Sequence, residues 1–255
     1  MLLKGSCYLL GKIQLTYIDG FVMQQHIFID NWVSLSANTS LNDEVPLTVP
    51  ARFEKTQLPK LDWVKPMQRR RLSPFAKMAL YCAHQAAGEI KPLPSVFSSR
   101  HGDLHKTSML LDDLAEGEAL SPTAFSLSVH NAVSGLFTIL TENQQATNTV
   151  VAGKNTLLMA VLDAYARIKS GLVDQMLVVH CDQALPDIYL PYADELQIDH
   201  AVAFILGERR LTDNSIEIDF AKLASALESN ENNTPQALRL GQWLIEQQLC
   251  STDWK

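Results

Sequence analysis

The stretch TNTVVAGKNTLLMAVLDAYARIKSG, Thr147 to Gly171, decides the fold of this chain. It begins with β-branched residues and continues with apolar residues three and four positions apart, as on the buried face of a helix. We therefore predict a strand over 146–152 and a helix from about Asn155 to Ser170. The turn between them, 152–156, reads AGKNT and holds neither Ser nor Cys. Because such turns carry those nucleophiles in several enzyme families, this one is either a site with another chemistry or a scaffold without its nucleophile.

Strand-like and helix-like stretches alternate along the rest of the chain, which is typical of a layered α/β fold. The best-marked helix lies in RLSPFAKMALYCAHQAAG, where Ser73 is the expected N-cap, Pro74 the first helical residue and Gly88 the stop. Ser128 is the expected cap of the helix that follows it. Further strands are expected over 26–36, 95–102, 175–183, 199–210 and 215–223, and further helices over 105–117 and from 234 to about 249.

Composition limits the classes of function that the chain can have. Of its 255 residues, 47% are hydrophobic, which is enough for a sizeable core. The net charge of -7 argues against a nucleic-acid partner, which needs clustered Lys and Arg in excess. No run reaches the roughly 18 apolar residues of a membrane span. The four scattered cysteines form no CxxC pair and are typical of a reducing cytoplasm, and we expect neither a cofactor nor a metal.

Three stretches in this order carry a family resemblance: SPTAFSLSVHNAVSGLF, then TNTVVAGKNT with AYARIKSGLVDQMLVV, then DHAVAFILGERR. Over about Ile27 to Arg210 the chain resembles the N-terminal half of the β-ketoacyl synthases, which have the thiolase fold. The resemblance implies a thiolase-like layered α/β fold, N-terminal half only, with a mixed five-stranded sheet and helices on both faces. It implies one such domain over 26–255. Residues 1–25 match no clear period and stay an unplaced extension, with a weak possibility of a signal peptide.

The resemblance also locates the position of the family's catalytic cysteine. In the family that cysteine lies on the turn between a strand and a buried helix, and the equivalent here is Lys154, flanked by Gly153 and Asn155. The turn is then a thiolase-type pedestal that has lost its sulfur, and it should not lie on the outside of the molecule. The family's two catalytic histidines come from the C-terminal half, whereas all seven histidines here lie between His26 and His200, so none matches them by motif.

A half-length member without the cysteine most resembles the chain-length-factor-like subunits of bacterial type II fatty acid and polyketide systems, including the short forms of aryl polyene clusters. The resemblance implies a non-catalytic partner of a full-length β-ketoacyl synthase, which walls the acyl tunnel across a heterodimer interface. Two alternatives stay open. One is an active acyltransferase or condensing enzyme that uses Lys154 or another non-Cys residue. The other is a module that binds an acyl chain or its carrier.

Several further residues are candidates for a role in such a subunit. His130, Asn131 and Thr156 are candidates for the substrate pocket, although a structural role suits the first two as well. Arg69, Arg70 and Arg71 could meet an acidic partner such as an acyl carrier protein, or form a solvated charge run. We interpret HGDLH, 101–105, as a solvated loop. His180-Cys181-Asp182 fits core packing, because neighbouring residues of a strand point to opposite faces and form no relay.

Overall fold

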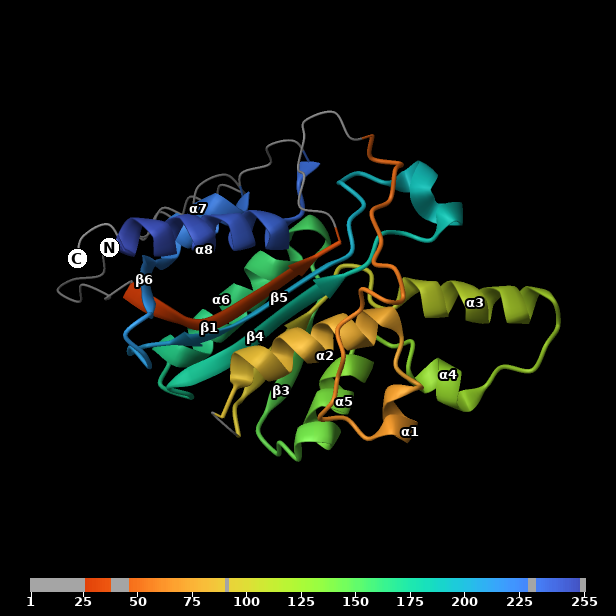
Figure 1. Cartoon of the computed structure of the whole chain (residues 1–255), viewed down its shortest axis with the longest axis horizontal. Helices are drawn as coiled ribbons and strands as arrows, with labels where there is room; N and C mark the ends of the chain where they lie inside the picture. Colours follow the sequence, from red (N-terminus) through yellow and green to blue (C-terminus); the bar gives the residue numbers. More distant parts are fainter. Residues whose placement is uncertain (1–25, 38–45, 90–91, 229–232, 253–255) are drawn as a thin grey trace, which may run out of the picture.

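The computed structural model describes residues 26–37, 46–89, 92–228 and 233–252 (Figure 1). The unplaced extension 1–25, and with it the possibility of a signal peptide, lies outside the described residues. In chain order the elements are β1 (His26–Ser36), α1 (Pro66–Arg69), α2 (Pro74–Ala87), β2 (Ser95–Ser98), α3 (Leu104–Ala115), α4 (Pro122–Ser126), α5 (Ala132–Thr141), β3 (Thr147–Val150), the 3-10 turn η1 (Gly153–Asn155), α6 (Thr156–Lys169), β4 (Gln175–Asp182), η2 (Asp187–Tyr192), β5 (His200–Gly207), β6 (Ile216–Asp219), α7 (Phe220–Glu228) and α8 (Gln236–Thr252).

The strands form one mixed sheet in the order β3-β2-β4-β5-β1-β6. The first three run parallel, and β5, β1 and β6 continue the sheet in antiparallel pairs. The sheet therefore has six strands, and the five implied by the family resemblance were one too few. Strand β6 pairs with the outer edge of β1, and its alternating Ile216 and Ile218 face the core.

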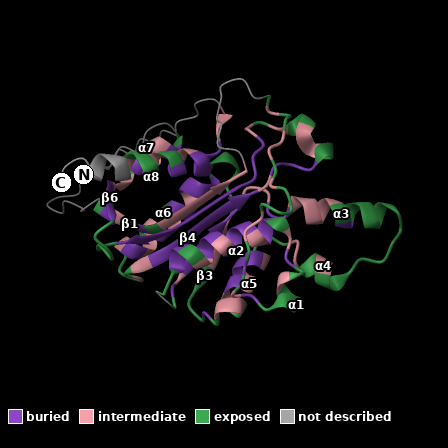
Figure 2. Ribbon diagram, viewed as in Figure 1, coloured by how far each residue is buried: buried purple, intermediate pink, exposed green. Residues whose placement is uncertain are grey.

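Helices cover both faces of the sheet, as predicted. One core lies between the sheet and helices α2 and α5, and the other between the sheet and helices α6, α7 and α8. The central strands β4 and β5 are buried on both faces (Figure 2), which explains why their sequences read as continuous apolar runs. In β4 the alternation sends Leu177 and Val179 into the first core and Met176 and Val178 into the second.

Helix starts were predicted well where the cap and the apolar period agree. The hydroxyl of Ser73 accepts a hydrogen bond from the amide of Ala76 at 3.1 Å, and α2 stops at Gly88, which has a φ of 53°. The expected cap at Ser128 was wrong: α5 begins only at Ala132, and Ser128 instead donates to the carbonyl of Phe125. The short helix α4 lies before it in the chain and begins at Pro122, with Ser121 as its N-cap.

The stretch 215–223 was predicted as one strand and is a strand followed directly by helix α7. Asp219 makes this change possible, because its carboxylate accepts a hydrogen bond from the amide of Ala221 at 2.8 Å and so caps the new helix. Among the helices of the described ranges, none has both the length and the apolar character needed to cross a bilayer.

Candidate functional site

The turn between β3 and α6 has the strand-to-helix geometry that the sequence predicts. Gly153 has a φ of +58°, a left-handed conformation that side chains disfavour. Thr156, which is buried, closes the turn with two hydrogen bonds: its hydroxyl accepts from the amide of Ala152 at 2.9 Å and donates to the carbonyl of Gly153 at 2.7 Å. These two hydrogen bonds fix the backbone of the turn, and neither involves a Ser or Cys side chain.

The turn lies on the surface of this chain. Residues 151–155 are all exposed, and only Thr156 is buried. Strand β3 is the edge strand of the sheet, so β2 covers it on one side only. The expectation that this turn does not lie on the outside of the molecule was therefore wrong for the chain by itself. The reason is that the turn follows an edge strand, with no described element packed over its outer side.

Lys154 takes part in a surface ion-pair network. Its ammonium lies 3.3 Å from Oδ2 of Asp194 and donates to the carbonyl of Asp194 at 2.9 Å. Arg100 also binds Asp194, at 2.9 Å, and binds Glu195 at 3.0 Å. The hydrogen bond from Arg100 lowers the pKa of Asp194, and Lys154 adds to this effect. A nucleophilic lysine needs desolvated surroundings, whereas 43% of the Lys154 side chain is exposed.

A small cleft connects this turn with the ends of the central strands. Its lining is formed by the turn, by the Arg100–Glu195 pair, by polar ends of β4 and β5, and by the start of α8 with the proline before it. Its free volume is about 10 Å³, which is about the space of one water molecule. The lining residues are Arg100, Gly153, Lys154, Thr156, His180, Asp182, Glu195, His200, Pro235 and Gln236.

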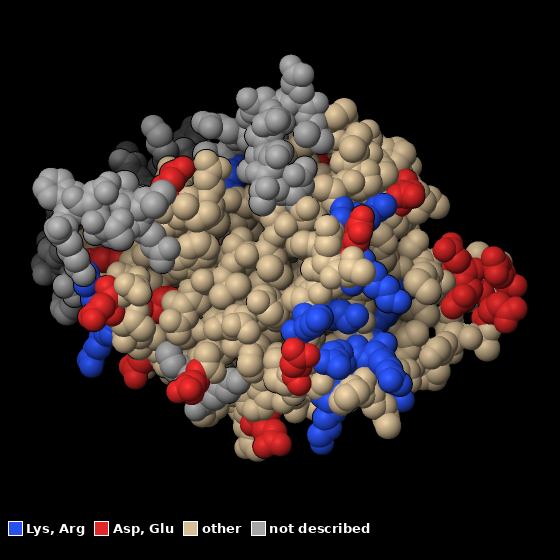
Figure 3. Space-filling view, in the orientation of Figure 1, with Lys and Arg blue, Asp and Glu red and all other residues tan. Residues whose placement is uncertain are grey.

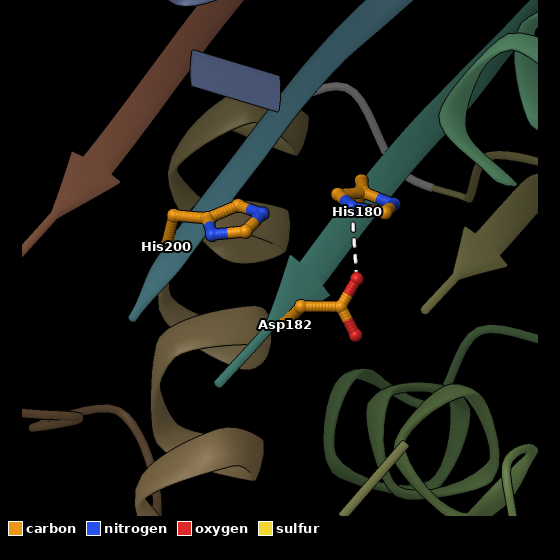
Figure 4. A group of neighbouring side chains, drawn as sticks. All are labelled: His180, Asp182 and His200. Carbon is orange, nitrogen blue, oxygen red and sulfur yellow. Dashed lines mark ion pairs between the residues drawn. The ribbon is translucent and has the colours of Figure 1, made fainter. Parts of the chain in front are cut away.

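Three buried polar side chains meet in this cleft because of the strand register. Antiparallel pairing sets Asp182 of β4 opposite His200 of β5. His180 lies two residues before Asp182, so both side chains point to the same face of the sheet. His180, Asp182 and His200 therefore turn toward one another (Figure 4) and are 5%, 4% and 3% exposed. One ligand-type atom of each lies within 4.8 Å of the other two.

Asp182 is held as a carboxylate by a dense set of donors. It accepts hydrogen bonds from the hydroxyl of Ser99 at 2.7 Å and from the amides of Arg100 and His101 at 3.0 and 3.2 Å. Nε2 of His180 lies 3.2 Å from Oδ2 of the same group. Burial alone would raise the pKa of Asp182, but the hydrogen bond with His180, the charge interactions with His180 and His200, and the hydrogen bond from Ser99 lower it well below its usual range.

Each histidine ring is fixed through its Nδ1 atom. Nδ1 of His200 lies 2.6 Å from the carbonyl of Ile198, which can only accept, so Nδ1 carries a proton. Nε2 of His200 is buried and has no hydrogen-bond partner among the described residues. Burial, followed by the charge of His180, lowers the pKa of His200, which favours its neutral form. Nδ1 of His180 lies 3.0 Å from the hydroxyl of Ser98.

Sequence reasoning missed this cluster, although it examined His180-Cys181-Asp182. Cys181 does point to the opposite face, into the core with α2, as expected for neighbours on a strand. The signal was the pair two residues apart, His180 and Asp182, which share a face. Ser98 next to His180 gives no nucleophile, because the cleft is lined by His180, Asp182 and His200 but not by Ser98, which is buried.

Of the other predicted pocket residues, the structure brings only Thr156 into the cleft. His130 and Asn131 are exposed, and the ring of His130 lies over Gly102. HGDLH is less solvated than expected: Asp103 is buried and caps α3 through the amide of Lys106, and Nε2 of His105 lies 2.8 Å from the carbonyl of Ala184. These side chains therefore have structural partners.

The arginine run lies in a basic region at the start of α2, visible as the blue group of Figure 3. Arg69 belongs to the short helix α1 and is paired with Asp62 at 3.0 Å. Arg70 and Arg71 are exposed. The three residues do precede the cap of α2, but Arg69 is occupied within the chain.

Comparisons with known proteins agree with this geometry. Residues 46–255 match the family model of the β-ketoacyl synthase N-terminal domain. The structure is similar to a chain of the ketosynthase ApeO in complex with its chain length factor ApeC from Xenorhabdus doucetiae, with 27% identity and a TM-score of 0.60 over 72% of this chain and 80% of that chain. Curated proteins give no match.

Two further solved structures share the fold at lower identity. The ishigamide ketosynthase/chain length factor has 13% identity and a TM-score of 0.53, over 73% of this chain and 63% of that chain. A β-ketoacyl synthase from Burkholderia phymatum STM815 has 12% identity and a TM-score of 0.56, over 72% of this chain and 59% of that chain. The mixed sheet between two helical layers is thus a thiolase-like ketosynthase fold. The chain belongs to the β-ketoacyl synthase N-terminal-domain family.

Proposed function

We propose that this chain is a chain-length-factor-like, non-catalytic subunit that pairs with a β-ketoacyl synthase in type II fatty acid or polyketide synthesis, of the aryl polyene type. The observation that carries the proposal is the turn 152–156, where Lys154, the residue that the family resemblance assigns to the cysteine position, is exposed and paired with Asp194. Support comes also from the similarity to a chain of the complex between the ketosynthase ApeO and its chain length factor ApeC. The cytoplasm is the proposed location.

The edge strand β3 is one part of the proposed partner surface. Its outer side has no neighbouring strand among the described residues, and unpaired strand edges readily add a strand from another chain. Val151, directly after β3, is 49% exposed, and Ile139 of the adjoining helix α5 is 70% exposed. A synthase that pairs with this edge would cover the apolar side chains and the turn with Lys154 together.

The arm formed by α3 and α4 is the other part of the proposed partner surface. It projects away from the sheet (Figure 1), and Leu110 is the buried residue of α3. Met109, Leu111 and Leu114 of α3 are 67%, 50% and 59% exposed, and Phe125 of α4 is 58% exposed. A helix that leaves this much apolar surface in water is typical of an interaction site. We therefore assign the arm to the synthase interface.

The acyl tunnel of the complex needs space that the cleft does not supply. The cleft beside the turn holds about one water molecule, which is far less than an acyl chain requires. In the proposal the tunnel lies between the two subunits, with this chain forming one wall. Arg70 and Arg71 are the proposed contacts for an acidic acyl carrier protein, because both are exposed and, unlike Arg69, form no ion pair with another described residue.

Co-expression with a full-length synthase that has its cysteine tests the proposal. We expect a stable heterodimer in native mass spectrometry and size-exclusion chromatography. Leu114→Glu combined with Val151→Glu should weaken pairing at least about tenfold, because a charge is then buried in an apolar interface. Ile245→Glu is the matched control: Ile245 is 50% exposed on α8, away from β3 and the arm, and pairing should be unchanged. A stable monomer that ignores the synthase contradicts the proposal.

The active-enzyme alternative has its own test. If Lys154 were an amine nucleophile, incubation of the chain with an acyl-thioester would leave an acyl mass adduct that Lys154→Ala removes. We expect no such adduct, because the ammonium is exposed and paired with Asp194. Lipid or carrier binding by the chain without any synthase partner would instead favour the binding-module alternative.

A further inference from the structure

We propose that His180, Asp182 and His200 bind one divalent transition-metal ion of the zinc type. The proposal goes beyond the function proposed above, because a subunit can pair with a synthase whether or not it holds a metal. The two proposals therefore fail separately. The metal site rests on four observations: the hydrogen bonds of the rings, the separation of the ligand atoms, the cleft and the local charge.

The hydrogen bonds leave the Nε2 atom of each ring for a ligand. In His200, Nδ1–H donates to the carbonyl of Ile198, so the buried, unpartnered Nε2 carries a lone pair in the neutral ring. In His180, the Ser98 hydroxyl donates its proton to the carbonyl of Val179 at 3.1 Å, so its oxygen accepts from Nδ1–H of His180. Histidines that bind metals are commonly fixed in this way, with the second nitrogen bonded to a carbonyl or another acceptor.

The three side chains also present their polar atoms to one small space. Nε2 of His180 lies 3.2 Å from Oδ2 of Asp182, and Nε2 of His200 is buried without a hydrogen-bond partner among the described residues. A metal ion placed between the three groups would bind all of them at once.

The separations fit a small ion. Two ligands that lie about 2.0–2.1 Å from a tetrahedral zinc are about 3.3 Å apart, close to the 3.2 Å between His180 and Asp182. The third ligand atom lies within 4.8 Å of the others, so the ring of His200 moves somewhat closer when the ion binds. All three residues line a cleft with room for about one water molecule, which leaves a place for a further ligand beside Lys154.

The local charge favours a cation. Around the cleft stand three carboxylates, Asp182, Asp194 and Glu195, and two fixed cations, Arg100 and Lys154. Because Arg100 and Lys154 pair with Asp194 and Glu195, the charge of Asp182 remains for the ion. Two imidazoles and one carboxylate suit zinc, cobalt or iron, whereas calcium and magnesium prefer all-oxygen sites.

The test uses the full chain, stripped of metals with EDTA, transferred to metal-free buffer and loaded with zinc chloride. We expect one zinc per chain to survive desalting, measured by elemental mass spectrometry. His200→Ala and Asp182→Asn should each weaken binding at least about 100-fold, and Ser98→Ala, which removes the hydroxyl that fixes Nδ1 of His180 and donates to Val179, about tenfold. His26→Ala is the matched control, because His26 is half exposed and outside the cluster, and binding should not change.

Cobalt(II) in place of zinc gives a second readout that does not depend on whether the variants fold. The cobalt-loaded wild-type chain should show the visible absorption of a nitrogen- and oxygen-ligated ion, without the intense thiolate band that cysteine ligands give. A chain that retains neither metal overturns the proposal. So does zinc retained equally by the wild type, His200→Ala and Asp182→Asn, because the ion then binds elsewhere.

Discussion

Two groups of residues line the same cleft in opposite environments. The turn with Gly153 and Lys154 is exposed, and its charge is paired on the surface. His180, Asp182 and His200, at the ends of the central strands, are buried. The family's topology explains the position of the turn, but it does not explain the buried cluster. The comparison teaches that the place of a site in a fold and the environment at that place are set by different parts of the sequence.

The largest expected effect comes from placing a thiol on the turn. In Lys154→Cys the new thiol is exposed just before the start of α6, where the N-terminal end of the helix favours the thiolate. The native Cys82 is its control within the same chain, because burial raises the pKa of Cys82 from 9.0 to about 12. That difference alone is worth about a thousandfold in thiolate.

We therefore expect iodoacetamide to alkylate position 154 at least about a thousandfold faster than Cys82 in the folded chain, as followed by peptide mass mapping over time. Equal protection of the two thiols would show that the turn is covered in the chain by itself, and the contrast between turn and cluster would be lost. Addition of a synthase partner should slow the labelling of position 154, since the proposed interface covers the turn.

The next largest effect is expected in the stability of the buried cluster. Asp182→Ala removes an acceptor that Ser99, Arg100, His101 and His180 share, and leaves buried donors without partners. We expect the free energy of unfolding in urea, measured with EDTA present, to fall by about 3–5 kcal/mol. Asp163→Ala is the matched control: Asp163 is partly exposed, pairs with Arg167 one helical turn away and lies 3.4 Å from the side-chain amide of Asn148, and its loss should cost about 1 kcal/mol or less. Similar losses of unfolding free energy in both variants would mean that the buried carboxylate contributes no more to stability than the partly exposed one.

Much of the fold could be predicted from the sequence, because period and cap agree in most elements. Strands β4 and β5 are covered on both faces and read as apolar runs, and Ser73 with Pro74 starts α2 where expected. The failures occur where one local signal serves two elements. Ser128 resembles a cap but ends the turn after α4, and Asp219 both ends β6 and caps α7.

The candidate site was predicted only in part, for a different reason. The position of the turn follows from local sequence, so Gly153, Lys154 and Thr156 were placed correctly on it. Its exposure depends on β3 being an edge strand, which is a property of the whole sheet. The cluster depends on the register that sets Asp182 opposite His200, two residues 18 positions apart. No local period reveals that register, because it is decided by the packing of both strands in the sheet.

The smallest effect on stability is expected in the exposed ion-pair network around Lys154. Asp194→Asn removes one of two carboxylates bound to Arg100, while Glu195 stays at 3.0 Å. Because 48% of the Asp194 side chain is exposed, screening limits the expected loss of unfolding free energy at pH 7 to about 1 kcal/mol or less. The hydrogen bond from Arg100 lowers the pKa of Asp194 in the folded chain. Its stabilisation is thus fully present above the unfolded pKa of about 3.9 and is lost as the pH falls through the lower folded value. Urea unfolding should show that the difference in free energy of unfolding between the wild type and Asp194→Asn shrinks from pH 7 to about pH 2. A difference that persists in acid would mean that Asp194 stabilises the fold through packing and not through its charge.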